Sequence, residues 1–396
     1  MRLTQIFRAL DGKYAEKFIK YGTYSPTPLS LAKLTSFGST DLSAIRSAKF
    51  MSKELPVRLA NIMQEIHLLP DNLLKTPSVS LVISWYESSF KELIDFDDQL
   101  NEKNVKIFTD NLDRIRKRHA DVVNTMAEGL IELRERHKVD IITNNHLQYF
   151  LDRFYMMRIS IRMLINQHVL LFGSEEETRR RLIGTIDPNC NIYEIILDAY
   201  ENAKYLCNHY YAGAPELKID TDIEFLKEFQ MVYVPSHLHH ILFELIKNSM
   251  RAVMESVKVK KCDKIPPVSI MLTSGSEDIT IKVISDEGGG IPRSQMDFVF
   301  QYTYTTGQQK LLEGRSENSN APLAGYGYGL PLSRLYARYF NGELLLASVD
   351  NYGTEALLYL KKSEAEADEV LPIFNKTSAR QYNSSSTPVH DWSNIR

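Results

Sequence analysis

The sequence of 396 residues has few cysteines, no long apolar run and no block of basic residues. Its three cysteines, Cys190, Cys207 and Cys262, fit neither a disulfide framework nor a zinc site, so we expect reduced thiols in an intracellular protein. No window approaches the ~18 continuous apolar residues of a membrane helix, which argues against membrane insertion. The net charge of −3 and the lack of a basic cluster argue against nucleic acid as a partner.

Hydrophobic periodicity divides the chain into two halves. Apolar residues recur at steps of three and four within 82–93 and 147–165, which predicts long amphipathic helices packed as an antiparallel bundle. A polar, glycine-containing segment at 173–188 interrupts this pattern, and we expect a domain boundary there. The predicted units are a helical bundle at 1–175, a second domain at 176–362 and a polar tail at 363–396.

The second half alternates helical and strand patterns. Apolar and polar residues alternate in two places, which predicts one β-hairpin at 268–283 and another at 343–361. Helices are expected at 193–210 and from Pro235 onward, with Ser236 as the N-cap of the latter. Helices beside hairpins indicate an α+β sandwich.

One face of the helix that follows Pro235 carries polar side chains suited to a metal-bound polyphosphate. Glu244, Lys247, Asn248 and Arg251 lie at positions i, i+3, i+4 and i+7, and therefore on one face. An amide oxygen can bind Mg²⁺, which prefers oxygen ligands, and the two cations can bind phosphate oxygens. Taken alone, such a pattern is more often a solvated helix face.

A first glycine-rich segment directly follows the predicted hairpin. Asp286, Gly288 and Gly290 form the pattern Asp-x-Gly-x-Gly. An acid at a strand end beside an open glycine backbone can accept a hydrogen bond from an adenine amino group. Taken alone, the segment is an ordinary glycine turn.

A second glycine-rich segment enters a predicted helix, where backbone N–H groups and the positive end of the helix dipole can bind phosphate. It lacks the lysine of a P-loop and the βαβ unit of a dinucleotide site. The polar stretch 293–324 before it is expected to be a lid, in which Thr305 and Thr306 can reach phosphate. Outside the lid, Thr354 of the last hairpin can place a hydroxyl near adenine. The residues of the phosphate segment are Gly325, Tyr326, Gly327, Tyr328, Gly329 and Leu330.

In their order and spacing, these motifs together have the pattern of the gyrase and histidine-kinase ATPase fold, and the chain resembles one branch of it, the mitochondrial pyruvate dehydrogenase kinases. The resemblance extends from about Tyr24 to Trp392. The segments that carry it are 53–63, 149–154, 158–168, 234–238, 325–340, 375–378 and Asp391-Trp392. The branched-chain ketoacid dehydrogenase kinases share the ATP motifs but not this tail, and they remain an alternative.

The resemblance implies an α + α/β fold, with an N-terminal four-helix bundle followed by a gyrase/histidine-kinase-type ATPase α/β sandwich. It implies a homodimer in the mitochondrial matrix that uses ATP, Mg²⁺ and potassium. It implies transfer of the γ-phosphoryl group to serines of the pyruvate dehydrogenase decarboxylase component, which inactivates that complex and restrains pyruvate oxidation. It also implies docking on lipoyl domains of the acyltransferase core. Arg2 and Arg8, with no acid before Asp11, fit a transit-peptide remnant, although a first helix is the simpler interpretation.

The resemblance assigns catalytic roles to individual residues. Glu244 matches the general base, with Lys247 beside it, and Asn248 matches the Mg²⁺ ligand. Asp286 matches the adenine-binding acid, and 325–330 match the phosphate loop. His240 lies one helical turn before Glu244, so we expect it to hydrogen-bond that carboxylate and tune its pKa.

The resemblance also assigns an allosteric pocket for pyruvate-like inhibitors and a lipoyl-binding surface. Met157 stands where the family commonly has serine, which predicts weaker inhibition by pyruvate analogues. An apolar lipoyl pocket is matched by Leu29, Phe37 and Phe50, and Asp391 and Trp392 match a tail that acts in trans as a latch. The allosteric pocket comprises Leu59, Tyr86, Ser89, Ile115, Arg116, His119, Arg158, Ile161 and Arg162.

Two further hypotheses compete with the serine kinase. One is an ATP-dependent conformational or scaffold protein of the same fold, and the complete set of ATP motifs argues against a scaffold without activity. The other is a histidine kinase that uses His119, which requires an aspartate-bearing partner.

Overall fold

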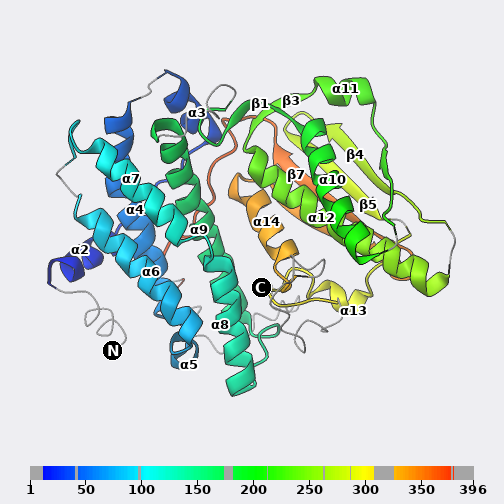
Figure 1. The fold of residues 1–396 in the computed structure, drawn as a ribbon, viewed down its shortest axis with the longest axis horizontal. Helices are drawn as coiled ribbons and strands as arrows, with labels where there is room; N and C mark the ends of the chain where they lie inside the picture. Colours follow the sequence, from blue (N-terminus) through cyan, green and yellow to red (C-terminus); the bar gives the residue numbers. More distant parts are fainter. Residues whose placement is uncertain are drawn as a thin grey trace, which may run out of the picture.

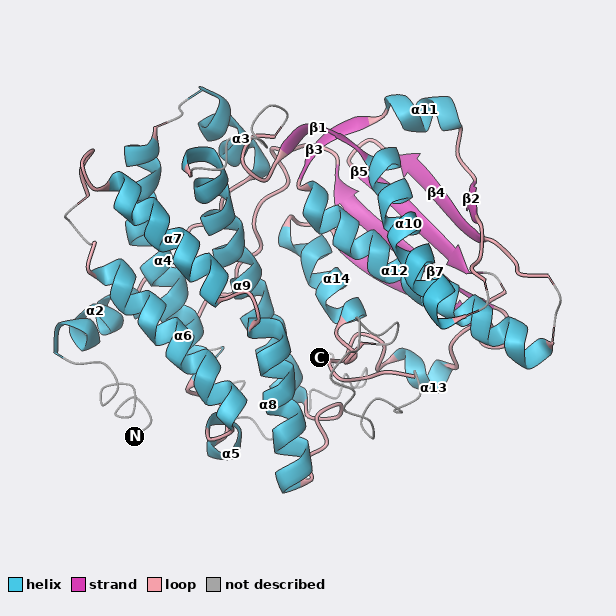
Figure 2. Cartoon of the chain, in the orientation of Figure 1, coloured by secondary structure: helices cyan, strands magenta, loops and turns pink. Residues whose placement is uncertain are grey.

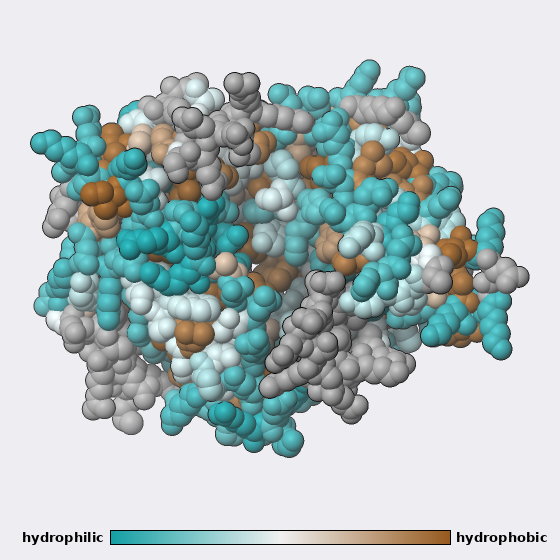
Figure 3. Space-filling view, viewed as in Figure 1, coloured by the Kyte–Doolittle hydropathy of each residue, from teal (hydrophilic) through white to brown (hydrophobic). Residues whose placement is uncertain are grey.

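A helical half lies beside a half in which helices cover a sheet (Figure 1). The computed structural model describes residues 12–40, 43–96, 100–173, 182–211, 213–261, 264–285, 287–306, 325–375 and 378. Within those ranges no helix is long and apolar enough to cross a bilayer. The face seen in Figure 3 is largely hydrophilic, with apolar patches scattered over both halves.

All the named elements that the described residues form in the first half are helices, as the periodicity predicts. Its helices begin where the sequence offers capping groups: the Ser43 side chain accepts the Arg46 N–H at the start of α4, and the Asn144 side chain accepts the Leu147 N–H at the start of α9. The helices are α2 (Gly12–Gly22), α3 (Leu31–Thr40), α4 (Ala44–Ile66), α5 (Asp71–Leu74), α6 (Pro77–Ile94), α7 (Val105–Arg118), α8 (Val122–His137) and α9 (Asn145–Phe172).

The second half is a mixed sheet with helices on one face (Figure 2). Five strands pair in the order β2-β4-β5-β7-β6, parallel between β2 and β4 and antiparallel elsewhere. β1 and β3 form a separate antiparallel pair. The elements are β1 (Asp187–Asn191), α10 (Ile192–Tyr210), β2 (Leu217–Ile219), α11 (Ile223–Glu228), β3 (Gln230–Tyr233), α12 (Pro235–Lys260), β4 (Val268–Ser274), β5 (Asp278–Ser285), α13 (Arg293–Met296), α14 (Gly329–Tyr339), β6 (Glu343–Val349) and β7 (Gly353–Lys361).

Both predicted hairpins are confirmed, β4–β5 and β6–β7, and so are the helices at α10 and α12. The predicted N-cap of α12 is wrong: Val234 is the N-cap, and Pro235 occupies the first helical position. Proline is favoured there because its fixed φ suits the helix and its missing N–H would be unpaired anyway. Ser236 therefore falls inside the first turn.

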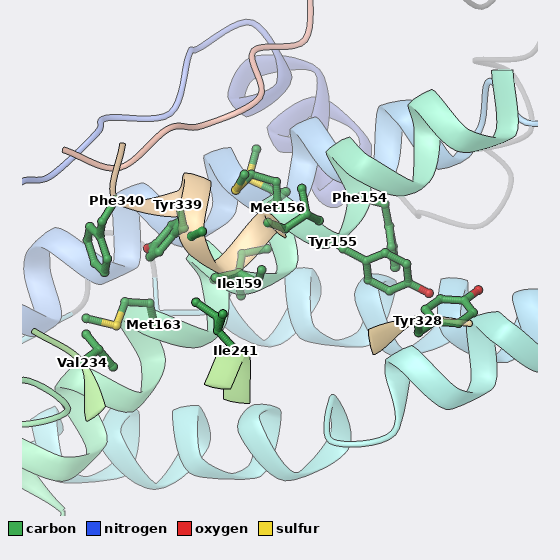
Figure 4. Close-up of a cluster of buried hydrophobic side chains, with 14 of the residues drawn as sticks. Phe154, Tyr155, Met156, Ile159, Met163, Val234, Ile241, Tyr328, Tyr339 and Phe340 are labelled. Atoms are coloured by element: carbon green, nitrogen blue, oxygen red, sulfur yellow. The ribbon is translucent and has the colours of Figure 1, made fainter. Parts of the chain in front are cut away.

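The two halves share one apolar core, because α9 packs on the helical half with one side and on the sheet half with another. Figure 4 shows side chains of α9 meeting residues at the start of α12 and at both ends of α14. The labelled residues of this cluster are Phe154, Tyr155, Met156, Ile159, Met163, Val234, Ile241, Tyr328, Tyr339 and Phe340.

The described part of the segment after β7 is bound to both halves by backbone hydrogen bonds. The Leu31 N–H donates to the Ala367 carbonyl, and the Glu369 N–H donates to the Leu29 carbonyl, so this segment lies along the start of α3. The Val370 N–H donates to the carbonyl of Tyr339 at the end of α14. The first part of the predicted tail therefore joins the two halves, while Asp391 and Trp392 lie outside the described residues.

Candidate functional site

A cavity of about 640 Å³ lies at the end of the sheet half where α12, α14 and the glycine-rich segments meet. It gathers every nucleotide-site residue predicted from the sequence that the structure describes; Asp286 lies outside the described residues. Val123 and Asn124 of α8 also line it, so the helical half contributes to the cavity. The predicted residues in its lining are His240, Glu244, Lys247, Asn248, Arg251, Gly288, Gly290, Thr305, Thr306, Gly325, Tyr326, Gly327, Tyr328, Gly329, Leu330 and Thr354.

The polar face of α12 forms one wall. Lys247 Nζ donates to Glu244 Oε1 at 2.6 Å, and the Lys247 side chain is only 9% exposed. Arg251 Nη2 donates to the hydroxyl of Thr306 at 3.2 Å, and its Nε lies 3.7 Å from Glu255 Oε1, an ion pair too long for a hydrogen bond. A cation held at the cavity wall suits a phosphate oxygen.

The N-terminus of α14 forms the wall opposite. Its N-cap, Tyr328, provides no side-chain hydrogen bond to the first turn, so the backbone N–H groups there are uncapped by side chains. A Cβ at Gly329 would overlap Glu244 Oε2, so a larger residue at this helix start would require the carboxylate to move. An uncapped helix N-terminus lined by glycine can bind an anion such as phosphate.

The third wall is the loop after β5, held against the β6–β7 turn. Gly290 has φ +68°, and a Cβ there would overlap the Val349 carbonyl. The Ile291 N–H donates to Ser348 Oγ at 2.7 Å, and Ser348 Oγ lies 2.8 Å from Thr354 Oγ1. Thr354 is thus fixed by Ser348, a residue that sequence analysis did not select because its partner lies across the hairpin.

The predicted hydrogen bond from His240 to Glu244 is wrong. His240 Nε2 is buried without a partner, and Lys247 rather than His240 holds the Glu244 carboxylate. Burial lowers the pKa of His240, the Glu244 charge opposes this shift, and the Lys247 charge adds to it. His240 is therefore favoured in its neutral form at the edge of the cavity.

Part of the predicted allosteric pocket surrounds a second, much smaller cavity of about 10 Å³. Arg116, His119, Arg158, Ile161 and Arg162 line it, together with Ile165, which the sequence did not single out. This volume suffices for about one water molecule. A small carboxylate would therefore require the arginine side chains to move apart.

The remaining predicted residues of this pocket lie around His119. Ser89 Oγ lies 2.9 Å from His119 Nε2, and the Tyr86 ring lies 4.6 Å from the His119 ring. Burial is the largest cause that lowers the pKa of His119 to about 4, and the charges of Arg158, Arg118 and Arg162 act in the same direction. Leu59 and Ile115 are core residues. Met157 is buried and does not line the small cavity, so the predicted loss of inhibitor sensitivity stays a prediction.

Of the residues of the predicted lipoyl pocket, Leu29 contacts the docked C-terminal segment. Leu29 and Phe37 are half-buried, and Phe50 is 38% exposed. Leu29 pairs through its backbone with Glu369, whose carboxylate also accepts the Leu29 N–H at 3.0 Å. One residue of this surface is thus bound to a segment 340 positions away in the chain.

Comparisons with known proteins agree with this geometry. Residues 28–187 match a family model described as mitochondrial branched-chain alpha-ketoacid dehydrogenase kinase, and residues 233–364 match one described as histidine kinase-, DNA gyrase B-, and HSP90-like ATPase. The chain is 50% identical to a mitochondrial [pyruvate dehydrogenase (acetyl-transferring)] kinase of Drosophila melanogaster, with 94% of this chain and 91% of the relative covered. It is also 50% identical to isozyme 1 of Homo sapiens, covering 94% and 85%, and 49% identical to isozyme 3 of Mus musculus, covering 100% and 94%.

Proposed function

Because the chain belongs to the family of the mitochondrial pyruvate dehydrogenase kinases, we propose that it is a protein-serine kinase that phosphorylates the decarboxylase component of the pyruvate dehydrogenase complex and inactivates it. The observation that carries this proposal is the single cavity that joins the Glu244–Asn248 helix face to the glycine-rich start of α14. The relatives' names favour pyruvate over branched-chain substrates.

The geometry supports a different role for each residue group around the γ-phosphate of ATP. Glu244 accepts the proton of the serine hydroxyl while that oxygen bonds to the γ-phosphorus, and the bond from γ-phosphorus to the bridging oxygen breaks to release ADP. Lys247 keeps the Glu244 carboxylate in place through the 2.6 Å contact. The uncapped N–H groups at Gly329 and Leu330, with Arg251, stabilise the phosphate oxygens.

The donor set fits one Mg²⁺ that is bound mainly through ATP. Among the described residues no group of three or more His, Cys, Asp or Glu side chains could hold a metal ion, and the Asn248 amide oxygen is the predicted ligand in the cavity. Mg²⁺ commonly binds through one or two protein oxygens, water and substrate phosphates. When bound, it neutralises charge on the phosphate oxygens. Potassium, as a second ion, rests on the resemblance alone.

We base the proposed partners and location on the resemblance to this family. We place the protein in the mitochondrial matrix, docked on lipoyl domains of the acyltransferase core near Leu29, Phe37 and Phe50. A homodimer through the sheets is supported by Met271 and Leu345, which point away from the core and are 37% and 43% exposed.

In the proposed domain division the bundle ends near 175, the ATP domain covers 176–362, and the tail at 363–396 carries the latch at Asp391 and Trp392. Trp392→Ala should lower lipoyl-domain affinity while ATP binding persists.

Incubation with radiolabelled ATP and purified pyruvate dehydrogenase complex tests the proposal. We expect acid-stable phosphate on serine of the decarboxylase component and a parallel loss of complex activity. Glu244→Gln, which keeps the size of the side chain but not the base, should slow transfer by about 10²–10⁴-fold. The branched-chain ketoacid dehydrogenase complex serves as the control substrate. Faster phosphorylation of that control, or acid-labile phosphate on this protein alone, would refute the proposal.

A further inference from the structure

Gln148 of the helical half binds the backbone of the sheet half directly beside the nucleotide cavity. Its Oε1 accepts the Tyr302 N–H at 2.8 Å, and its Nε2 donates to the Tyr302 carbonyl at 3.2 Å. The same Nε2 donates to the Ile141 carbonyl at 3.0 Å. The side chain is only about 6% exposed, so these bonds form away from bulk water, where an unpaired polar group is costly.

Tyr302 is the base of the segment that reaches the phosphate end of the cavity. The chain turns immediately after it, since Thr303 has φ +68°, and then runs to Tyr304, Thr305 and Thr306 in the cavity lining. Thr306 receives the hydrogen bond from Arg251. Fixing both backbone groups of Tyr302 therefore fixes the starting point of this wall.

The phosphate loop rests on the same base. A Cβ at Gly327 would overlap backbone atoms of Thr303 and Tyr304, so the loop lies directly against the turn that Gln148 anchors. Tyr155 lies two turns after Gln148 on the same face of α9. Its ring lies 5.4 Å from the Tyr302 ring and 5.7 Å from the Tyr328 ring. Figure 4 shows Tyr155 of α9 beside Tyr328, the N-cap of α14. One helix thus supports both sides of the phosphate end.

We propose that Gln148 is a positioning residue for the phosphate end of the ATP site: its amide holds Tyr302, and through Tyr302 it sets the place of Thr306 and of the loop at Gly327. The inference rests on the proposed use of ATP. Glutamine suits the task because one amide supplies both the acceptor for an N–H group and the donors for two carbonyl groups.

We expect the consequence to be larger for ATP than for ADP. Loss of Gln148 should loosen the walls at Thr306 and Gly327, while the pocket wall at Gly290 and Thr354 is held by its own bonds to the β6–β7 turn. We therefore expect Gln148→Ala to weaken binding of a non-hydrolysable ATP analogue by on the order of tenfold, and ADP binding by clearly less. Gln148→Glu should act in the same direction without changing side-chain size, because its carboxylate cannot donate to the two carbonyl groups.

Gln167 provides a matched control on the same helix. It is equally buried, and its amide also bridges backbone groups, from Thr185 N–H at 2.8 Å to the Ile183 carbonyl at 2.9 Å, but it does not line the nucleotide cavity. Gln167→Ala removes a comparable set of bonds and should leave the ratio of the two nucleotide affinities unchanged.

The measurement is calorimetric titration of the full-length protein and the three variants with the Mg²⁺ complexes of ADP and of the ATP analogue. A larger loss for the ATP analogue in both Gln148 variants, absent in Gln167→Ala, supports the inference. An unchanged ratio in Gln148→Glu, or the same change in Gln167→Ala, would overturn it. Failure of the unmodified protein to bind either nucleotide would instead overturn the proposed function on which the inference rests.

Discussion

Arg58 and Glu369, which lie 311 positions apart, form an ion pair in which neither side chain has exposed surface. Two guanidinium nitrogens of Arg58 bind the two carboxylate oxygens of Glu369, at 3.0 and 2.8 Å. Glu54 accepts from Arg58 Nε, and the Tyr339 hydroxyl donates to Glu369. The pair therefore ties α4 and the end of α14 to the C-terminal segment.

We predict that Glu369→Gln lowers the free energy of unfolding by about 3–5 kcal/mol, because it leaves the buried Arg58 charge without its main counter-charge. Urea denaturation of the variant and the unmodified protein measures this difference. Asp95→Asn is the control, since the Lys13–Asp95 pair is 65% and 48% exposed and solvent screening makes its contribution much smaller. Equal effects of the two substitutions would contradict a structural role for the buried pair.

Gly329→Ala tests the close approach of α14 to Glu244. The added Cβ would overlap Glu244 Oε2, so the carboxylate must move. A displacement of about 1 Å at a reacting group can cost about 10²-fold in rate, and we expect a loss of kcat of that order. Gly325→Ala is the comparison within the same loop: its Cβ would meet nothing within 4 Å, so its loss should be smaller. Wild-type kcat in Gly329→Ala would remove this contact from the mechanism.

Asn248→Ala tests the assignment of the metal ligand. Asn248 lines the cavity one turn beyond Glu244, and loss of its oxygen should abolish measurable binding of Mg²⁺·ATP. Calorimetric titration with and without Mg²⁺ separates the metal-dependent part of the affinity. Asn202→Ala, on exposed surface of α10, is the control. Unaltered Mg²⁺·ATP affinity in Asn248→Ala would show that this amide is not a ligand.

Because His119 is buried, we predict that the protein loses stability in mildly acidic solution. Its pKa is lowered from 6.5 to about 4, so folding favours the neutral ring, and protons bind preferentially to the unfolded chain. The stabilisation is complete above about pH 6.5 and is lost as the pH falls toward about 4. A shift of this size corresponds to about 3 kcal/mol.

Urea denaturation between pH 7 and pH 4 measures this change for the unmodified protein and His119→Gln. The variant should lose less stability than the unmodified protein over this range. His168 and His237, whose pKa values are lowered to about 4 and about 3 by burial, act in the same direction and remain in both proteins. His146→Gln, on the exposed side of α9, is the matched control for the substitution itself. A slope in His119→Gln equal to that of the unmodified protein would show that His119 does not titrate with folding.

Local rules were enough to predict the elements and the residues on each face. The 3.6-residue period placed Glu244, Lys247 and Asn248 together on α12, and the structure has all three in one cavity. Alternation and turn residues located both hairpins within a residue or two. The order of the three ATP motifs was also readable, because each motif is a short segment whose chemistry depends on its own residues.

Those rules did not predict which of two neighbouring residues would bind a given group. His240 and Lys247 both lie within a turn of Glu244, and spacing alone does not say which of them binds the carboxylate. In the structure the flexible lysine reaches Glu244, and His240 Nε2 is buried without a partner. Ser236 offered a good N-cap side chain, but the fixed φ of Pro235 moved the helix start to Val234.

Only the tertiary structure decided which distant segments meet. Gln148 and Tyr302 are 154 positions apart, and Arg58 and Glu369 are 311 apart, so no period or motif links them. Both contacts form where the two halves pack together, because a buried polar group is costly unless the chain that packs beside it supplies a partner. The sequence by itself therefore determined the helices, the hairpins and the chemistry of the ATP motifs, while packing across the two halves decided what holds that chemistry in place.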